Sequence, residues 1–96
     1  MPTYITLVNL TEQGIRNIKQ VPDRIQEALQ IATDLGVRFT PYMTIGPYDF
    51  VGIAEAPDDE TIAQVNLSIA SRGDVRTLTM PAFGIDEIGR IVEGIR

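Results

Sequence analysis

The chain has 96 residues, of which 44% are apolar and 6% aromatic, and its formal net charge at pH 7 is −5. This length is typical of one small domain, so we expect residues 1–96 to form a single domain. The absence of cysteine and histidine excludes disulfides and thiolate nucleophiles, and it removes the commonest metal ligand and general base. The negative charge disfavours nucleic acid as a partner, because binding to its backbone relies on lysine and arginine.

Targeting signals are not visible in this sequence. The first residues lack the basic and apolar regions of a secretory leader, and no apolar run approaches the ~20 residues that cross a bilayer. We therefore expect a cytoplasmic protein without a membrane partner.

The first half of the chain predicts a strand followed by helices. Residues 3–10 alternate as a strand, and because both of its faces are fairly apolar we expect both to be covered. Thr11 is a good N-cap for a helical segment at 12–20. Pro22 interrupts that segment and begins an amphipathic helix at 22–35, which Gly36 ends.

A hairpin is predicted next. Residues 37–45 and 48–56 read as strands, and Gly46-Pro47 between them has the composition of a turn. Pro41 cannot donate a hydrogen bond to a neighbouring strand, so it predicts an edge position or a bulge.

The remaining elements are two helices separated by a strand. Asp58 is the expected N-cap of a helix that ends near Arg72, and residues 75–82 form a fourth strand. Residues 85–95 predict a last helix with an apolar stripe of Ile85, Ile88, Val92 and Ile95. Two glycines weaken that helix by ~1 kcal/mol each, so we expect it to depend on docking to its own sheet or to a partner.

The order of elements is β-α-β-β-α-β plus a C-terminal helix. This is the ferredoxin-like pattern of α+β proteins, with a four-stranded antiparallel sheet.

Several short motifs give the chain a family resemblance. Gly46, Tyr48 and Asp49, with Pro47 as spacer, match a Gly-Tyr-Asp signature. Supporting matches are Leu10-Thr11 with Gly14-Ile15, Glu55-Ala56-Pro57-Asp58-Asp59, and Gly73-Asp74-Val75-Arg76-Thr77. On these residues the chain resembles the GYD domain family through Phe83. The resemblance implies a ferredoxin-like fold related to dimeric α/β barrels, in a family whose biochemical role is largely uncharacterised.

The candidate site residues lie mostly around the hairpin. Tyr48 and Asp49 are adjacent in the expected strand, so their side chains should point to opposite faces. In the simpler interpretation Tyr48 packs at the strand end and Asp49 hydrogen-bonds loop amides. In the functional one, either lines a ligand pocket with other polar residues. The candidate pocket residues are Arg24, Tyr42, Tyr48, Asp49 and Glu55.

A carboxylate pair or a metal site is not expected. Asp49 and Glu55 are six residues apart on one expected strand, which separates them by about 20 Å. The acidic run at residues 58–60 is explained by the start of a helix. We expect neither a metal nor another cofactor.

The threonines suggest how the sheet is used. Strand parity predicts an open face without helices that is neither charged, apart from Arg38, nor strongly hydrophobic. Its expected residues are Thr40, Tyr42, Thr44, Thr77 and Thr79, joined by Tyr4, Thr6 and Val8. Such a face suits sheet-on-sheet dimerisation around a small cavity, although a solvated face of ordinary strand residues is the alternative.

Two classes of function follow. The first is a homodimer or higher homo-oligomer that binds a small organic molecule or a protein without catalysis. The second is a cofactor-independent enzyme of the dimeric α/β-barrel type, an oxygenase or isomerase acting on a small organic substrate. Its acid and base would have to be tyrosine, carboxylate or arginine side chains, since the chain has no histidine or cysteine.

Overall fold

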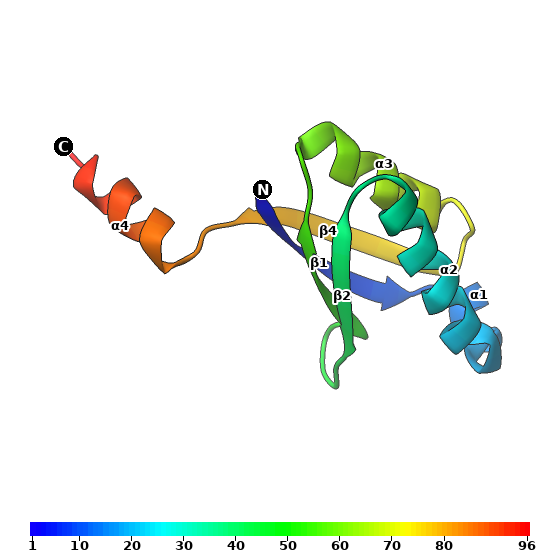
Figure 1. Ribbon diagram of the computed structural model, residues 1–96. Helices are drawn as coiled ribbons and strands as arrows, with labels where there is room; N and C mark the ends of the chain where they lie inside the picture. Colours follow the sequence, from blue (N-terminus) through cyan, green and yellow to red (C-terminus); the bar gives the residue numbers. More distant parts are fainter.

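The computed structural model describes residues 1–96 as one antiparallel sheet with two helices packed on one of its faces (Figure 1). In chain order the elements are β1 (Thr3–Leu10), α1 (Glu12–Arg16), the 3-10 helix η1 (Ile18–Gln20), α2 (Val21–Asp34), β2 (Arg38–Met43), β3 (Phe50–Glu55), α3 (Asp59–Ala70), β4 (Val75–Ala82) and α4 (Ile85–Glu93). The strand order is β2-β3-β1-β4. This arrangement confirms the ferredoxin-like β-α-β-β-α-β pattern with an extra C-terminal helix.

The strand positions follow the sequence closely, whereas the first helix does not. β1 and β4 have the expected bounds, and Pro41 lies on the edge strand β2 as expected. The single helical segment expected at 12–20 was wrong. α1 ends at Arg16, because the backbone of Asn17, with φ −99° and ψ 26°, leaves the helical region, and η1 follows.

The hairpin between β2 and β3 has a longer loop than expected. β3 begins at Phe50, so Tyr48 and Asp49 lie in the loop, and the expectation that they point to opposite faces of a strand was wrong. Thr44 closes this loop, since its N–H donates to the Asp49 carbonyl at 2.9 Å and its hydroxyl to the Tyr48 carbonyl at 2.6 Å. Gly46 has φ +140°, a conformation that side chains disfavour.

The core lies between the sheet and helices α2 and α3. Its buried apolar residues are Tyr4, Ala32, Val37, Ala54, Ala56, Ile62 and Val65. Small residues dominate the strand positions, which lets the helices and the Phe39 ring approach closely. A Cβ at Gly52 would lie 2.0 Å from that ring. Buried hydroxyls are paired, because Thr6 and Thr79 bond each other at 2.9 Å and the Asn66 amide donates to Thr79 at 2.5 Å.

The expected composition of the two sheet faces was wrong. Register places Thr6 opposite Gly52 and Thr79, so Thr6, Thr77 and Thr79 share the face that carries the helices. Thr40 is on the other face, opposite Ile53. The threonine-lined open face therefore does not exist, and Tyr4, Thr6 and Val8 are not part of it. The sequence did not decide which face of the sheet the threonines occupy, because β1 and β4 carry apolar residues on both faces.

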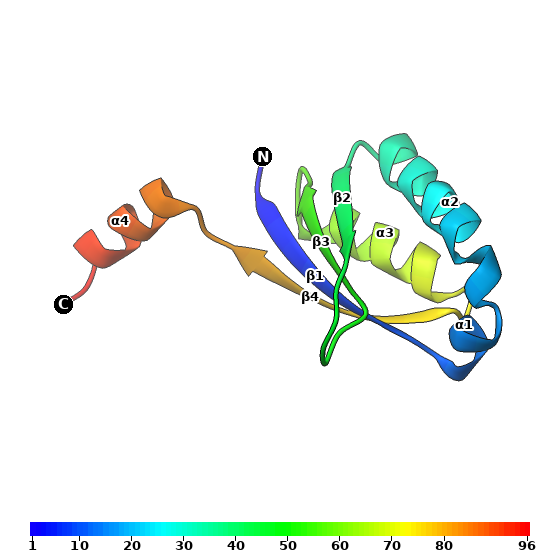
Figure 2. The ribbon, with the colours of Figure 1, turned by 90° about the horizontal axis from the view of Figure 1, so that it is seen from below.

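Helix α4 stands apart from the rest of the chain (Figures 1 and 2). It projects beyond the end of β4, and the radius of gyration of 14.7 Å exceeds the ~12.5 Å typical of a compact chain of this length. It ends at Glu93, two residues before the expected end. Helix lengths and hydropathies show no candidate for a membrane span.

Candidate protein-interaction surface

The sheet face opposite α2 and α3 is uncovered and apolar. We call it the open face and define it by its side chains, which are Ile5, Leu7, Val51 and Ile53 on the inner strands, Leu78 and Met80 on the edge strand β4, and Thr40 and Tyr42 on the edge strand β2. Ile53 is 45% exposed, Leu78 54% and Tyr42 58%. A contiguous apolar surface of this kind is typical of an interaction site rather than of a solvated face.

Charge is confined to the margin of the open face. On one side Arg38 and Glu55 lie opposite each other on β2 and β3. On another, Arg76 lies opposite Asn9 on β4 and β1. The central positions carry no ionisable group, so the face has the apolar core and polar rim of a protein interface.

A second apolar surface lies on α4. Its residues Ile85, Ile88, Ile91 and Val92 follow helical spacing on one side, Ile95 lies just beyond its end, and all five are exposed. The charged residues of α4 occupy the opposite side. The first turn is stabilised locally, because the Glu87 carboxylate accepts the Gly84 N–H at 3.1 Å.

The structure disperses the candidate pocket residues. Tyr42 lies on the open face and Glu55 at its margin. Val51, the partner of Tyr42 across the strands, is four residues from Glu55, or about 13 Å along β3. Arg24 lies on α2 on the other side of the sheet, and Tyr48 lies in the hairpin loop. These residues therefore do not line one common pocket within a single chain.

Asp49 ties the hairpin loop to the end of β1. Its carboxylate accepts the Leu10 N–H at 2.8 Å, and its own N–H donates to the Val8 carbonyl at 2.9 Å. Both bonds extend the pairing between β1 and β3 beyond Phe50. The aspartate of the Gly-Tyr-Asp signature thus holds the loop in register, as the simpler interpretation proposed, although the amide it binds is in β1 rather than in its own loop.

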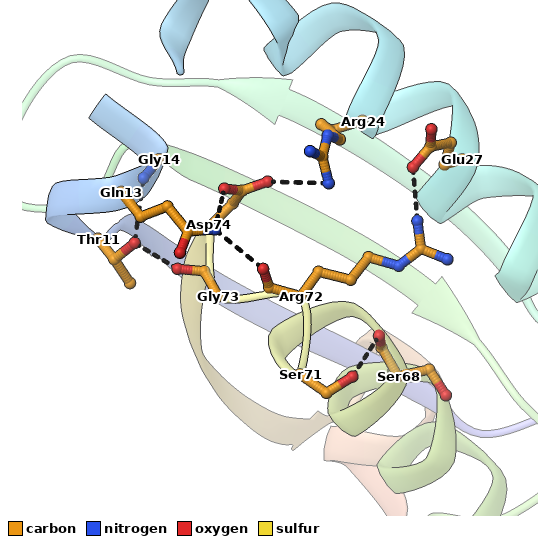
Figure 3. Close-up of polar contacts among 10 residues, drawn as sticks. All are labelled: Thr11, Gln13, Gly14, Arg24, Glu27, Ser68, Ser71, Arg72, Gly73 and Asp74. Carbon is orange, nitrogen blue, oxygen red and sulfur yellow. Dashed lines mark hydrogen bonds and ion pairs between the residues drawn. The ribbon is translucent and has the colours of Figure 1, made fainter. Parts of the chain in front are cut away.

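Asp74 is the polar centre that the sequence did not single out (Figure 3). It is 93% buried, since only 7% of its surface is exposed. Its carboxylate accepts from the Gln13 amide at 2.9 Å and pairs with Arg24 at 3.5 Å, while its carbonyl accepts the Thr11 N–H at 2.9 Å. A Cβ at Gly14 would lie 2.2 Å from that carbonyl oxygen. Asp74 therefore joins α1, α2 and the turn before β4.

Arg24 is accounted for by this cluster. It and Arg72 border a cavity of about 70 Å³ lined by residues of α2, α3 and β4. Each arginine already has an acidic partner, since Arg24 pairs with Asp74 and Arg72 bonds Glu27 (Figure 3). These ion pairs hold α2 against the α3–β4 turn. The only sequence signal for the cluster was the presence of Thr11, Gly14, Gly73 and Asp74 among the family motifs.

Two ionisable groups with perturbed pKa values, Asp58 and Tyr4, serve the start of α3. Asp58 is its N-cap and accepts the Thr61 N–H at 2.8 Å, and bonds from the Thr61 side chain and backbone hold the pKa of Asp58 below its usual value. The buried Tyr4 hydroxyl donates to Asp59, and this hydrogen bond together with burial raises the pKa of Tyr4 to about 12. No group of three or more acidic residues is close enough to hold a metal ion.

Known proteins resemble the chain in both sequence and structure. The GYD domain profile matches residues 4–92. A Thermus thermophilus protein named "glutamine synthetase and cystathionine beta-lyase binding protein" is 42% identical over 90 residues, covering 92% of this chain and 95% of that protein. The crystal structure of TTHA0845, also from Thermus thermophilus, superposes with a TM-score of 0.58 at 27% identity, covering 88% of this chain and 95% of that one.

A more distant structure supports the fold alone. The crystal structure of FFRP-DM1 has a TM-score of 0.59 at 20% identity, and the match covers 86% of this chain and all of that one. Because the family profile spans nearly the whole chain and a 42%-identical relative matches almost end to end, the chain belongs to the GYD domain family.

Proposed function

We propose that this chain is a homodimeric protein-binding domain without catalytic activity, and that its two sheets pack face to face in a dimeric α/β barrel. The observation that carries the proposal is the open face, which is apolar at its centre and charged only at its margin. Sheets that pack in this way lie about 10 Å apart and interdigitate their side chains.

A second copy is a suitable cover because the open face complements itself. Its centre is aliphatic, so two copies related by a two-fold axis bring apolar surface against apolar surface. The margin carries both charge signs, Arg38 and Glu55, which allows opposite charges to meet between copies. Tyr42 at the edge would then border any small cavity between the sheets, and its hydroxyl would be available to a small organic ligand there.

The protein partner is proposed from the 42%-identical relative. That protein is named for binding glutamine synthetase and cystathionine β-lyase, and we infer that this chain binds at least one of the corresponding enzymes. A binding role agrees with the dispersal of Arg24, Tyr42, Tyr48, Asp49 and Glu55, which forms no acid–base pair within one chain. The enzyme alternative has no comparable geometric support.

Purified components test the binding role. Glutamine synthetase and cystathionine β-lyase from the organism that supplies this chain are each titrated with the chain in a calorimeter. We expect a saturable isotherm with at least one enzyme, at a dissociation constant of about 100 µM or tighter. The control is the same titration with an unrelated enzyme of similar charge. Absence of heat with both enzymes, together with absence of a mass shift in light scattering, would contradict the proposed partner.

A further inference from the structure

We infer that α4 is an exchanged arm, whose apolar stripe docks on the second copy of this chain in the homodimer. The stripe consists of Ile85, Ile88, Ile91, Val92 and Ile95. The inference rests on the homodimer proposed above and adds to it the segment that clasps the two copies together.

Helix α4 needs an external surface to be stable. It has nine residues, and isolated helices shorter than about 12–15 residues are marginal in water. Gly89 in its middle weakens it further relative to alanine. Yet Ile85 is 87% exposed and Ile88, Ile91 and Val92 are about half exposed, so the single chain supplies little compensating burial.

The rest of the chain makes no hydrogen bond or ion pair with the arm. Every hydrogen bond involving residues 84–95 is local to that segment, and no ion pair joins it to the body. Both views show the arm continuing outward from the end of β4, away from α2 and α3 (Figures 1 and 2). The apolar stripe of the arm is therefore left uncovered by the rest of its own chain.

The open face alone has less area than a stable dimer interface needs. Four strands spaced ~4.8 Å apart, each contributing six to eight residues, outline a face of roughly 400–500 Å². Two such faces bury about 800–1,000 Å², which is below the ~1,200 Å² lower limit of a standard interface. A helix of nine residues presents roughly 135 Å² on one side and covers about as much of the receiving copy, so two docked arms add about 540 Å² and bring the total to about 1,300–1,500 Å². The sheets alone fall short, and the arms make up the difference.

The aliphatic chemistry of the stripe favours a second copy over a different protein. The stripe is purely aliphatic, like Ile5, Ile53 and Leu78 on the open face, while Asp86, Arg90 and Glu93 lie on the opposite side of the helix. The arm also follows β4 after only Phe83 and Gly84, and Leu78 and Met80 of β4 belong to the open face, so arm and face are joined through the same strand. In a two-fold dimer each copy gives one arm and receives one, which closes the assembly.

Substitutions in the full chain test the arm. Sedimentation equilibrium is measured on the wild type, on Ile88→Glu/Ile91→Glu, and on Gly89→Glu. The control adds a glutamate to the same helix at a position where a Cβ would meet nothing within 4 Å. We expect the double variant to dimerise at least about 100-fold more weakly, since it loses the burial of two isoleucines, and the control to stay within about threefold of the wild type.

The outcomes separate the two proposals. A monomeric wild type would overturn the homodimer and the arm together. A dimeric wild type whose double variant dimerises equally well would overturn the arm alone. The arm is also overturned if the double variant loses binding to the purified enzymes while its dimer is unchanged, because the stripe would then serve that partner.

An isotope-filtered nuclear Overhauser experiment identifies the receiving molecule without any substitution. ¹³C-labelled and unlabelled wild-type chains are mixed so that mixed dimers form. We expect Overhauser effects between the methyl groups of Ile88 or Ile91 in the labelled copy and protons of the unlabelled copy. If these methyl groups show effects only within their own copy, the arm folds back on its own chain and the inference fails.

Discussion

The two faces of the sheet differ in a way that is unusual for an isolated domain. The face under α2 and α3 carries small and hydroxyl-bearing residues such as Thr6, Gly52 and Thr79, and it is buried. The open face carries large aliphatic residues such as Ile53 and Leu78, which are about half exposed. Apolar burial stabilises a fold by ~25 cal/mol per Å², so leaving this aliphatic face in water forgoes stabilisation that its burial would provide. The difference supports the proposed homodimer, in which the open face is covered.

The covered face shows how polar groups are tolerated inside. The hydroxyls of Thr6 and Thr79 bond each other, the Asn66 amide completes the set, and no buried side-chain polar atom lacks a partner. Small strand residues then let the helices lie close to the sheet. The covered face therefore depends on hydrogen-bonded close packing, whereas the open face is stabilised by association in the proposed homodimer.

A charge at the centre of the open face should have the largest effect. Ile53→Lys places an unpaired ammonium at the proposed interface of both copies, and unpaired buried charges cost about 3–5 kcal/mol. We expect dimerisation to weaken by at least about 100-fold while far-ultraviolet circular dichroism shows an intact fold. The matched control is Gln64→Lys on the exposed side of α3. Equal weakening in both variants would mean that net charge, and not the open face, controls association.

An added methyl group on the covered face should come next. Gly52→Ala places a Cβ 2.0 Å from the Phe39 ring, and overpacking of this kind costs about 1–3 kcal/mol of unfolding free energy. Urea denaturation at fixed protein concentration measures the change. Gly89→Ala in α4 is the control, and it should be neutral or stabilising by up to about 1 kcal/mol. If Gly52→Ala is as stable as the wild type, the packing of Phe39 is looser than described.

Threonine-to-valine changes compare the two faces directly. Thr79→Val removes the hydroxyl that pairs with both Thr6 and Asn66, so we expect a loss of about 1–3 kcal/mol in unfolding free energy. Thr40→Val on the open face breaks no hydrogen bond within the chain, and its effect should stay within about 0.5 kcal/mol. Chemical denaturation of both variants under identical conditions makes the comparison. Reversed effects would contradict the assignment of the faces.

The smallest expected effect is the pH dependence that Tyr4 confers. Its pKa is raised from 10.0 to about 12 by the hydrogen bond to Asp59 and by burial, so the folded state favours the neutral phenol. A raised folded-state pKa contributes stability that is complete below pH 10 and is lost as the pH rises from 10 toward 12. Tyr4→Phe should show a shallower decline of unfolding free energy over that range. Identical slopes for variant and wild type would show that Tyr4 does not contribute to the pH dependence of stability.

The sequence predicted the strands better than it predicted how their faces are used. β1 and β4 are bounded by strong local signals, Thr11 as a helix N-cap and Gly73 with positive φ before β4. The side of the sheet on which Thr77 and Thr79 lie depends on register with β1, which is a non-local property. Because buried threonines can satisfy each other, their polarity did not identify the exposed face.

In the candidate site too, features set by local sequence patterns were predicted and features set by contacts between separate elements were not. The apolar stripe of α4 followed from helical periodicity alone, since this is a local pattern. Asp74 was missed because its importance comes from Thr11, Gln13 and Arg24, which reach it from separate elements. The candidate pocket residues were chosen near a distinctive motif, and for Asp49 the structure shows a role in holding strand register.

The mass of the wild-type chain in solution tests the central claim most directly. Multi-angle light scattering coupled to size-exclusion chromatography, over about 1–100 µM chain, covers the range in which interfaces of standard size associate. The account predicts twice the 10.6 kDa mass of the chain, or a higher even multiple, across the upper part of that range. A mass of 10.6 kDa at every concentration would show that the open face stays in water, and it would contradict the account.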